Sequence, residues 1–158
     1  MLLLWSVSGD DGGRLLRVGT GRTDDGNAIV GRIQPRPLAV GFGREASWGP
    51  LWLMIRHSMK CWVQVTPILD GRVLTELAVT HELSAPDGGG AVDVPMKVYL
   101  SRPDDPDVPW SRQALRGVWF APRVEIEALE DGEVLAVGGF EIDVRPLGWA
   151  RGAINAGG

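Results

Sequence analysis

Apolar and polar residues alternate with a period of two along most of this chain, and turn-forming residues interrupt the alternation about every 8–12 residues. A β-strand places successive side chains on opposite faces, so this pattern predicts half-buried strands. No stretch has the apolar period of an amphipathic helix. The pattern therefore predicts an all-β fold, an antiparallel β-sandwich or jelly-roll-like domain of about nine short strands with little or no helix.

The strongest strand predictions in the middle of the chain cover residues 51–57 and 61–69. Asp70-Gly71 follows, a pair that favours the positive φ angles of a hairpin turn, so residues 73–80 are expected to form the return strand. Before the first of these strands, Gly41, Gly43, Gly49 and Pro50 predict breaks in the chain around Trp48.

Residues 118–128 and 134–145 are predicted to form the clearest hairpin of the chain, around Asp131-Gly132. In each strand, apolar residues alternate with charged ones, which predicts one core face and one charged face. If the two strands pair, their acidic residues share a solvated face of mixed charge. These residues are Glu125, Glu127, Glu141 and Asp143.

The chain has 158 residues, the size of one compact domain. Residues 1–147 are predicted to form a single β-sandwich domain. Residues 148–158 are rich in Gly and Ala and are expected to be a loose tail. The sequence contains no internal repeat, which argues against a propeller or solenoid.

The formal net charge is −4 and the isoelectric point is about 5.1. Nucleic acid is not an expected partner, because the densest basic stretch (Arg14, Arg17 and Arg22) is interrupted by turns. A membrane is not expected either, because the longest apolar run is far too short to span one. The apolar start of the chain is also too short for the core of a signal peptide.

The sequence offers no recognisable catalytic or metal-binding apparatus. His57 and His81 are expected at strand ends or in loops, outside any nucleophile motif. Cys61 is the only cysteine and is predicted to be a small buried residue. The acidic residues at 104–107 are interrupted by proline and lack the glycine of a calcium loop. We therefore expect neither an enzyme nor a bound metal or cofactor.

The sequence has seven tryptophans, and this excess of tryptophan is the feature of the composition that says most about function. Trp52 lies in an apolar run and Trp119 beside Phe120, so both are expected in the core. Other aromatic and apolar residues fall where burial within the domain is not required, and exposed aromatics mark contact surfaces. The candidate contact residues are Trp62, Trp110, Trp149, Leu2, Leu3, Leu4 and Trp5.

Five segments follow one another in a recognisable order: Thr23-Asp24-Asp25-Gly26, Arg36-Pro37-Leu38, the apolar residues 51–56, Val65-Thr66-Pro67-Ile68-Leu69-Asp70-Gly71-Arg72, and Gly139-Phe140-Glu141-Ile142-Asp143-Val144. This order resembles small β-sandwich proteins encoded among the tail and neck genes of tailed bacteriophages. The resemblance covers residues 23–147 and has no catalytic residue to carry over. It implies a structural subunit of the virion, assembled in the host cytoplasm in several copies around a symmetric particle.

Two functions follow as expectations. The first is a non-enzymatic virion subunit of the tail, neck or capsid decoration, with other virion proteins and copies of itself as partners. The alternative is a carbohydrate-binding β-sandwich module that holds a surface glycan with exposed tryptophans, above all Trp62 and Trp110. An enzyme with an unrecognised site is a third, weaker option.

Overall fold

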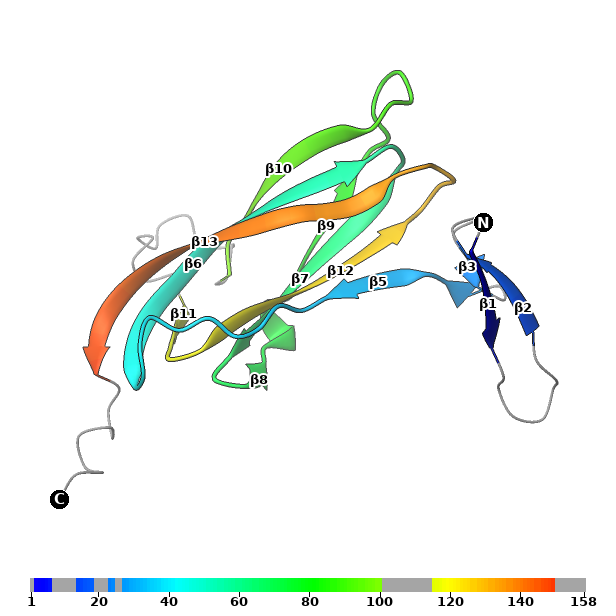
Figure 1. The fold of residues 1–158 in the computed structure, drawn as a ribbon. Coiled ribbons are helices and arrows are strands. Elements are labelled where there is room, and N and C mark those ends of the chain that lie inside the picture. The colour runs from blue at the N-terminus through cyan, green and yellow to red at the C-terminus, as the bar shows by residue number, and fades with distance from the viewer. Residues whose placement is uncertain (1, 7–13, 19–22, 25–26, 101–114, 150–158) are drawn as a thin grey trace.

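The computed structural model of the chain describes residues 2–6, 14–18, 23–24, 27–100 and 115–149. Antiparallel strands make up most of this part, and two larger sheets pack against each other as a sandwich (Figure 1). Within the described residues the only helical element is a 3₁₀ turn, η1 (Thr75–Leu77). The all-β sandwich expected from the alternation is therefore confirmed.

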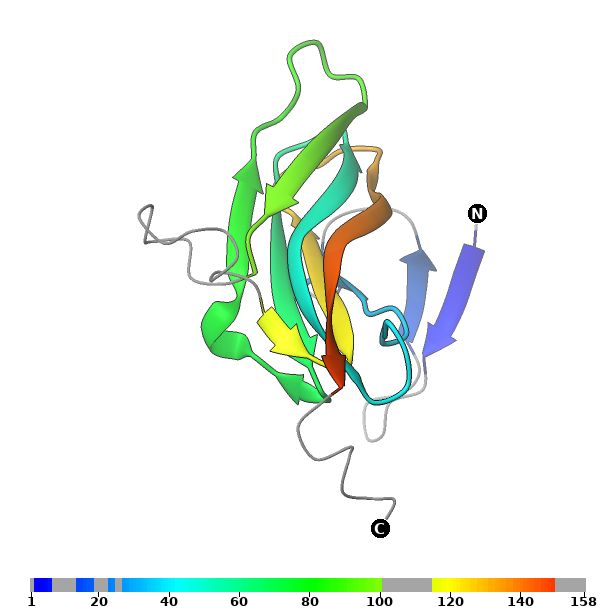
Figure 2. The same cartoon turned by 90° about the vertical axis from the view of Figure 1, so that its left-hand side faces the viewer.

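The first sheet is built on the long strand β6, which pairs with β13 along one side and with β10 and then β11 along the other. Figure 2 shows β10, β6 and β13 running side by side. The strands of this sheet are β6 (Arg44–His57), β10 (Val92–Val98), β11 (Leu115–Gly117) and β13 (Leu135–Trp149).

The second sheet has β12 and β7 at its centre, with β5 on the outer side of β12 and both β8 and β9 on the outer side of β7. Two small antiparallel pairs, β1 with β2 and β3 with β4, form sheets of their own. The strands of the second sheet are β5 (Val30–Ile33), β7 (Cys61–Leu69), β8 (Arg72–Val73), β9 (Val79–Leu83) and β12 (Phe120–Ala128). The small pairs are β1 (Leu2–Ser6), β2 (Arg14–Val18), β3 (Thr23–Asp24) and β4 (Asn27–Ala28).

The predicted hairpin around Asp131-Gly132 is wrong, although both of its strands exist. β12 pairs with β5 and β7, whereas β13 pairs with β6 in the opposite sheet. The segment between the two strands therefore crosses from one sheet to the other. A Ser58 hydroxyl accepts hydrogen bonds from the Glu133 and Val134 amides at 3.1 and 3.0 Å, which anchors this crossing to the end of β6.

The predicted hairpin turn at Asp70-Gly71 is confirmed, since both residues have positive φ angles (51° and 81°) and join β7 to β8. The return strand, however, is not continuous over residues 73–80. It stops at Val73, η1 follows, and the chain resumes as β9, which pairs with the first half of β7.

Strand β6 runs without interruption through Trp48, so the predicted break at Gly49 and Pro50 is wrong. Their peptide bond is cis, and Gly49 has a φ of 121°. Opposite them the register with β13 shifts, because Gly49 and Pro50 of β6 face the single residue Asp143 of β13 between the pairs Ile142↔Leu51 and Val144↔Trp48. The side chains that face the core are consequently even-numbered before this point (Ala46, Trp48) and odd-numbered after it (Leu51, Leu53).

The core lies between the two sheets and draws on both of them. Trp48 of β6 and Phe120 of β12 are its largest side chains, and their rings stack with centroids 5.5 Å apart. The buried apolar residues that form one continuous cluster are Ala46, Trp48, Leu51, Leu53, Ile55, Val63, Val65, Met96, Val98, Leu100, Phe120, Val124 and Ile126.

The last strand, β13, continues to Trp149, two residues past the predicted end of the domain. Gly148 and Trp149 pair with Glu45 and Arg44 at the start of β6. Leu115 begins β11, and residues 101–114 before it lie outside the described part of the chain.

Candidate interaction surfaces

Trp62, predicted as an exposed contact residue, is partly buried on the outer face of the second sheet. Its indole Nε1 donates a 2.7 Å hydrogen bond to the Glu127 carboxylate on the neighbouring strand β12. On the other side of Trp62 lies Glu82 of β9, which forms a 2.7 Å ion pair with Lys60. Trp62 is thus held by its own sheet, and its polar edge is already satisfied.

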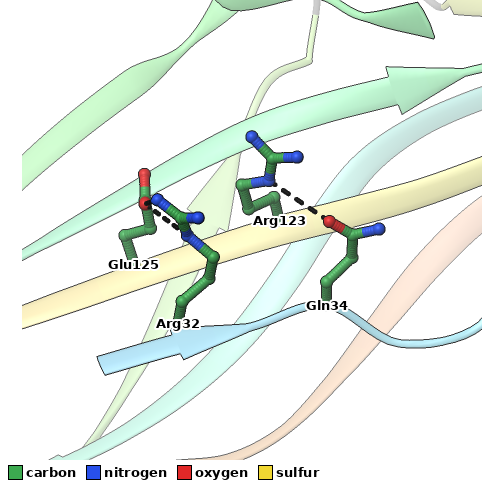
Figure 3. Close-up of polar contacts among 4 residues, drawn as sticks. All are labelled: Arg32, Gln34, Arg123 and Glu125. Atoms are coloured by element: carbon green, nitrogen blue, oxygen red, sulfur yellow. Dashed lines mark hydrogen bonds and ion pairs between the residues drawn. The ribbon is translucent and has the colours of Figure 1, made fainter. Parts of the chain in front are cut away.

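Two further contacts between side chains lie on this face, as Figure 3 shows. Arg32 of β5 forms an ion pair with Glu125 at 2.6 Å, and Arg123 donates a 3.2 Å hydrogen bond to Gln34. Such exposed pairs have little net energy, but they leave few free polar groups for a ligand. The mixed charge predicted for the surface around Glu125 is present, but only 15% of the Glu125 side chain is exposed.

Glu141 and Asp143 do not belong to that surface, so the expected grouping of four carboxylates on one face is wrong. Both residues lie on β13 in the first sheet, because the hairpin that would have joined them to β12 does not form. The carboxylate pairs therefore lie on separate sheets and cannot flank one bond as a glycosidase pair would.

Trp149, a predicted contact residue, is 59% exposed at the end of β13. The Arg44 guanidinium lies over its ring, 5.2 Å from the centroid.

Phe42, which the sequence did not mark as a contact residue, is 92% exposed. It lies in the tight turn that leads into Arg44, where the Arg44 amide donates a hydrogen bond to the Gly41 carbonyl. Val144 and Leu147 of β13 are exposed as well. We call Phe42, Val144, Leu147 and Trp149 the apolar end of the β6–β13 ribbon, which Figure 1 shows at the left.

Trp52 was expected in the core, and that prediction is wrong: it is 41% exposed on the outer face of the first sheet. The register shift near Gly49 places odd-numbered residues of β6 inside, so Trp52 and Met54 point outward. On the neighbouring strand β10, Pro95 and Lys97 lie directly opposite them. We call Trp52, Met54, Pro95, Lys97 and the following Tyr99 the Trp52 face.

Trp119 is the second tryptophan wrongly expected in the core, since it is 44% exposed beside the Asp70 turn. Of the remaining predicted contact residues, Trp110 lies outside the described residues. Leu2, Leu3, Leu4 and Trp5 form strand β1, whose backbone pairs with β2 and whose side chains are likewise outside the described part.

The titratable residues do not gather into a reactive centre in the described part of the chain. His57 ends β6, and its buried Nδ1 lies 2.9 Å from the Met59 carbonyl oxygen. His81 lies in the middle of β9 rather than at a strand end or in a loop, and its Nε2 is buried without a hydrogen-bond partner. Cys61 is buried as predicted, and burial raises the pKa of its thiol, which makes it a poor nucleophile.

Across the described ranges, no group of three or more His, Cys, Asp or Glu residues is placed to hold a metal ion. In the same ranges, no helix is long and apolar enough to cross a membrane.

The fold and these surfaces define an all-β sandwich whose distinguishing features are two separate groups of exposed aromatic residues. No protein-family model matches the chain, and no curated protein or solved structure is detectably similar to it.

The two residues that sequence reasoning missed differ in how they could have been found. Phe42 stands between two glycines in a turn, where no strand can bury it, so the local sequence carried the signal. Trp52 carried no such signal. Its direction depends on a register shift between β6 and β13, two strands far apart in the sequence.

Proposed function

We propose that this chain is a non-enzymatic structural subunit of a bacteriophage-like particle and works through contacts with copies of itself and with other virion proteins. The all-β sandwich agrees with the resemblance that first suggested this class. The single observation that carries the proposal is the apolar end, where Phe42 and Trp149 are more exposed than any other large apolar residues described.

The chemistry of the apolar end is that of a protein interface. Aromatic residues and arginine are enriched at the centre of such interfaces, while lysine and acids are depleted. Phe42 and Trp149 supply large rings, Val144 and Leu147 extend the apolar area, and Arg44 stacks on the Trp149 ring. An almost fully exposed Phe at the tip of a turn exposes apolar surface that a partner would remove from water, worth about 2 kcal/mol.

Light scattering coupled to size-exclusion chromatography tests self-assembly of the full chain at roughly micromolar to hundred-micromolar concentrations. We expect closed oligomers of one size. Phe42→Ser should weaken association by about 30-fold, the effect of losing a hot-spot residue of ~2 kcal/mol.

Met54→Ser is the matched control, because Met54 is an exposed apolar residue on a different surface and its loss should not change the oligomer. A chain that stays monomeric throughout this range would contradict self-assembly through the apolar end. An independent check is genomic: portal, tape-measure or capsid genes should lie beside this one.

A further inference from the structure

The Trp52 face differs in chemistry from the apolar end. Three directly opposed residues form one row across the first sheet: Lys97 of β10, Trp52 of β6 and Glu141 of β13. Opposed residues of antiparallel strands point to the same side of a sheet, so an ammonium, an indole and a carboxylate stand next to one another. Glu141 is exposed and has no ion-pair or hydrogen-bond partner among the described residues.

The two aromatic rings of this face are turned toward a common point. The Lys97 Nζ atom lies 5.0 Å from the centroid of the Trp52 ring and 5.1 Å from that of Tyr99. The faces of aromatic rings carry partial negative charge, which is what attracts the ammonium. The same property attracts the weakly positive C–H groups on the flat face of a sugar ring.

The surface next to the rings is open on the β13 side. Gly139 lies opposite Met54, and a Cβ atom added there would meet no other atom within 4 Å. The next pair on the same face, Ala136 with Arg56, also places a small side chain on β13. A flat ligand that extends from Trp52 toward Met54 would therefore meet little steric obstruction from β13, apart from the Glu141 side chain opposite Trp52.

The polar residues argue for a sugar rather than a protein as the occupant. Lysine and glutamate are depleted from the centres of protein interfaces, yet Lys97 and Glu141 flank Trp52 directly. Small-molecule sites combine aromatic surface with a few placed donors and acceptors, and hydroxyl groups of a sugar need both. Lys97 supplies a donor and Glu141 an acceptor.

We propose that the Trp52 face binds neutral pyranose sugars. One sugar ring stacks on Trp52 and displaces the Lys97 ammonium from the ring, and a second contacts Tyr99. The displaced ammonium then donates hydrogen bonds to sugar hydroxyls, while the Glu141 carboxylate accepts from them.

This sugar site is separate from the proposed protein interface. Trp52 is eight residues along β6 from Arg44, whose guanidinium lies over Trp149, and eight residues correspond to roughly 26 Å of extended strand. Ligand binding at the Trp52 face and assembly at the apolar end can therefore be measured independently.

The test measures binding of the full chain to immobilised neutral hexasaccharides, namely cellohexaose, maltohexaose and mannohexaose. We expect at least one to bind, and Trp52→Ala and Tyr99→Ala each to lower its affinity about tenfold or more. Glu141→Gln should weaken binding less, because an amide still offers an oxygen acceptor. Trp52→Phe should retain part of the affinity, which distinguishes loss of stacking from misfolding.

Trp62→Ala is the matched control, because Trp62 lies on the outer face of the other sheet and should leave sugar binding unchanged. Absence of binding to all three sugars at millimolar concentration would overturn the proposal, as would binding that survives Trp52→Ala. Loss of the oligomer in Trp52→Ala would assign this face to a protein partner and would also overturn it. Self-assembly is tested separately with Phe42→Ser. Failure of the sugar-binding proposal can therefore be distinguished from failure of the self-assembly proposal.

Discussion

Trp48 and Phe120 stack across the sandwich with their ring planes 21° apart, although they belong to strands of different sheets. The Trp48 Nε1 atom also donates a 3.0 Å hydrogen bond to the carbonyl of Gly117 in β11. One buried side chain thus connects its own strand, the opposite sheet and the short strand beside it.

Removing this central ring should be among the most destabilising changes in the domain. Trp48→Ala should lower the free energy of unfolding by about 3–5 kcal/mol, because it removes buried area and leaves a cavity. Trp48→Phe keeps a ring against Phe120 and should cost less, including ~1 kcal/mol for the lost hydrogen bond to Gly117. Urea unfolding measures both values, and equal losses in the two variants would contradict this account of Trp48.

Asp70 should stabilise the domain through its side chain as well as its backbone. Its Oδ1 atom accepts hydrogen bonds from the Val118 and Trp119 amides, both at 2.8 Å, while its φ of 51° suits Asp, Asn or Gly. Asp70→Ala should cost roughly 2 kcal/mol, because it removes both acceptor contacts and places alanine in the left-handed region. Asp70→Asn, which tolerates this φ and keeps an acceptor oxygen, should cost less than half as much in thermal or urea unfolding. Equal effects would show that these two contacts contribute little.

Gly117 is required by a close approach between β11 and β7. A Cβ atom there would lie 2.8 Å from Leu69 Cγ and 2.7 Å from Asp70 Oδ2, both too short for a real contact. Gly117→Ala should therefore destabilise the domain by about 1–3 kcal/mol through overpacking. Gly139→Ala is the control, since its added methyl has open space and the change should be neutral or slightly stabilising. A stability ranking in the opposite order would count against the packing of β11 on β7.

Cys61 should make the domain less stable at alkaline pH. Burial raises the pKa of its thiol, so the folded state keeps the proton at pH values where the unfolded thiol, with a pKa near 9.0, has lost it. The folded state then binds more protons than the unfolded state, and the free energy of unfolding falls as pH rises above about 9.

Cys61→Ala removes this contribution and should show a shallower decline between about pH 8 and pH 10 in urea unfolding. Lys60 contributes in the same direction only at higher pH, because the hydrogen bond and charge of Glu82 raise its pKa above 10.5. The same decline in the native chain and in Cys61→Ala would show that ionisation of this thiol is not linked to unfolding.

Local sequence was sufficient for several features of this protein. The alternation over residues 61–65 of β7 and 123–127 of β12 predicted which of these residues face the core, because a strand has only two faces. Asp70-Gly71 encoded its own turn, since those two residues tolerate positive φ angles where most others do not. The burial of Cys61 followed in the same way from its place in an apolar strand.

The tertiary structure alone decided the pairing of strands and therefore the location of the exposed aromatics. β12 and β13 are neighbours in sequence and have the spacing of a hairpin, yet they pair with strands of different sheets. Strand pairing depends on which apolar faces can be buried together, and the local sequence does not record this. A register shift opposite Gly49 then turned Trp52 outward while Trp48 remained in the core. The sequence by itself determined that this is an all-β sandwich rich in tryptophan; long-range register, which no local pattern records, determined which tryptophans a partner can reach.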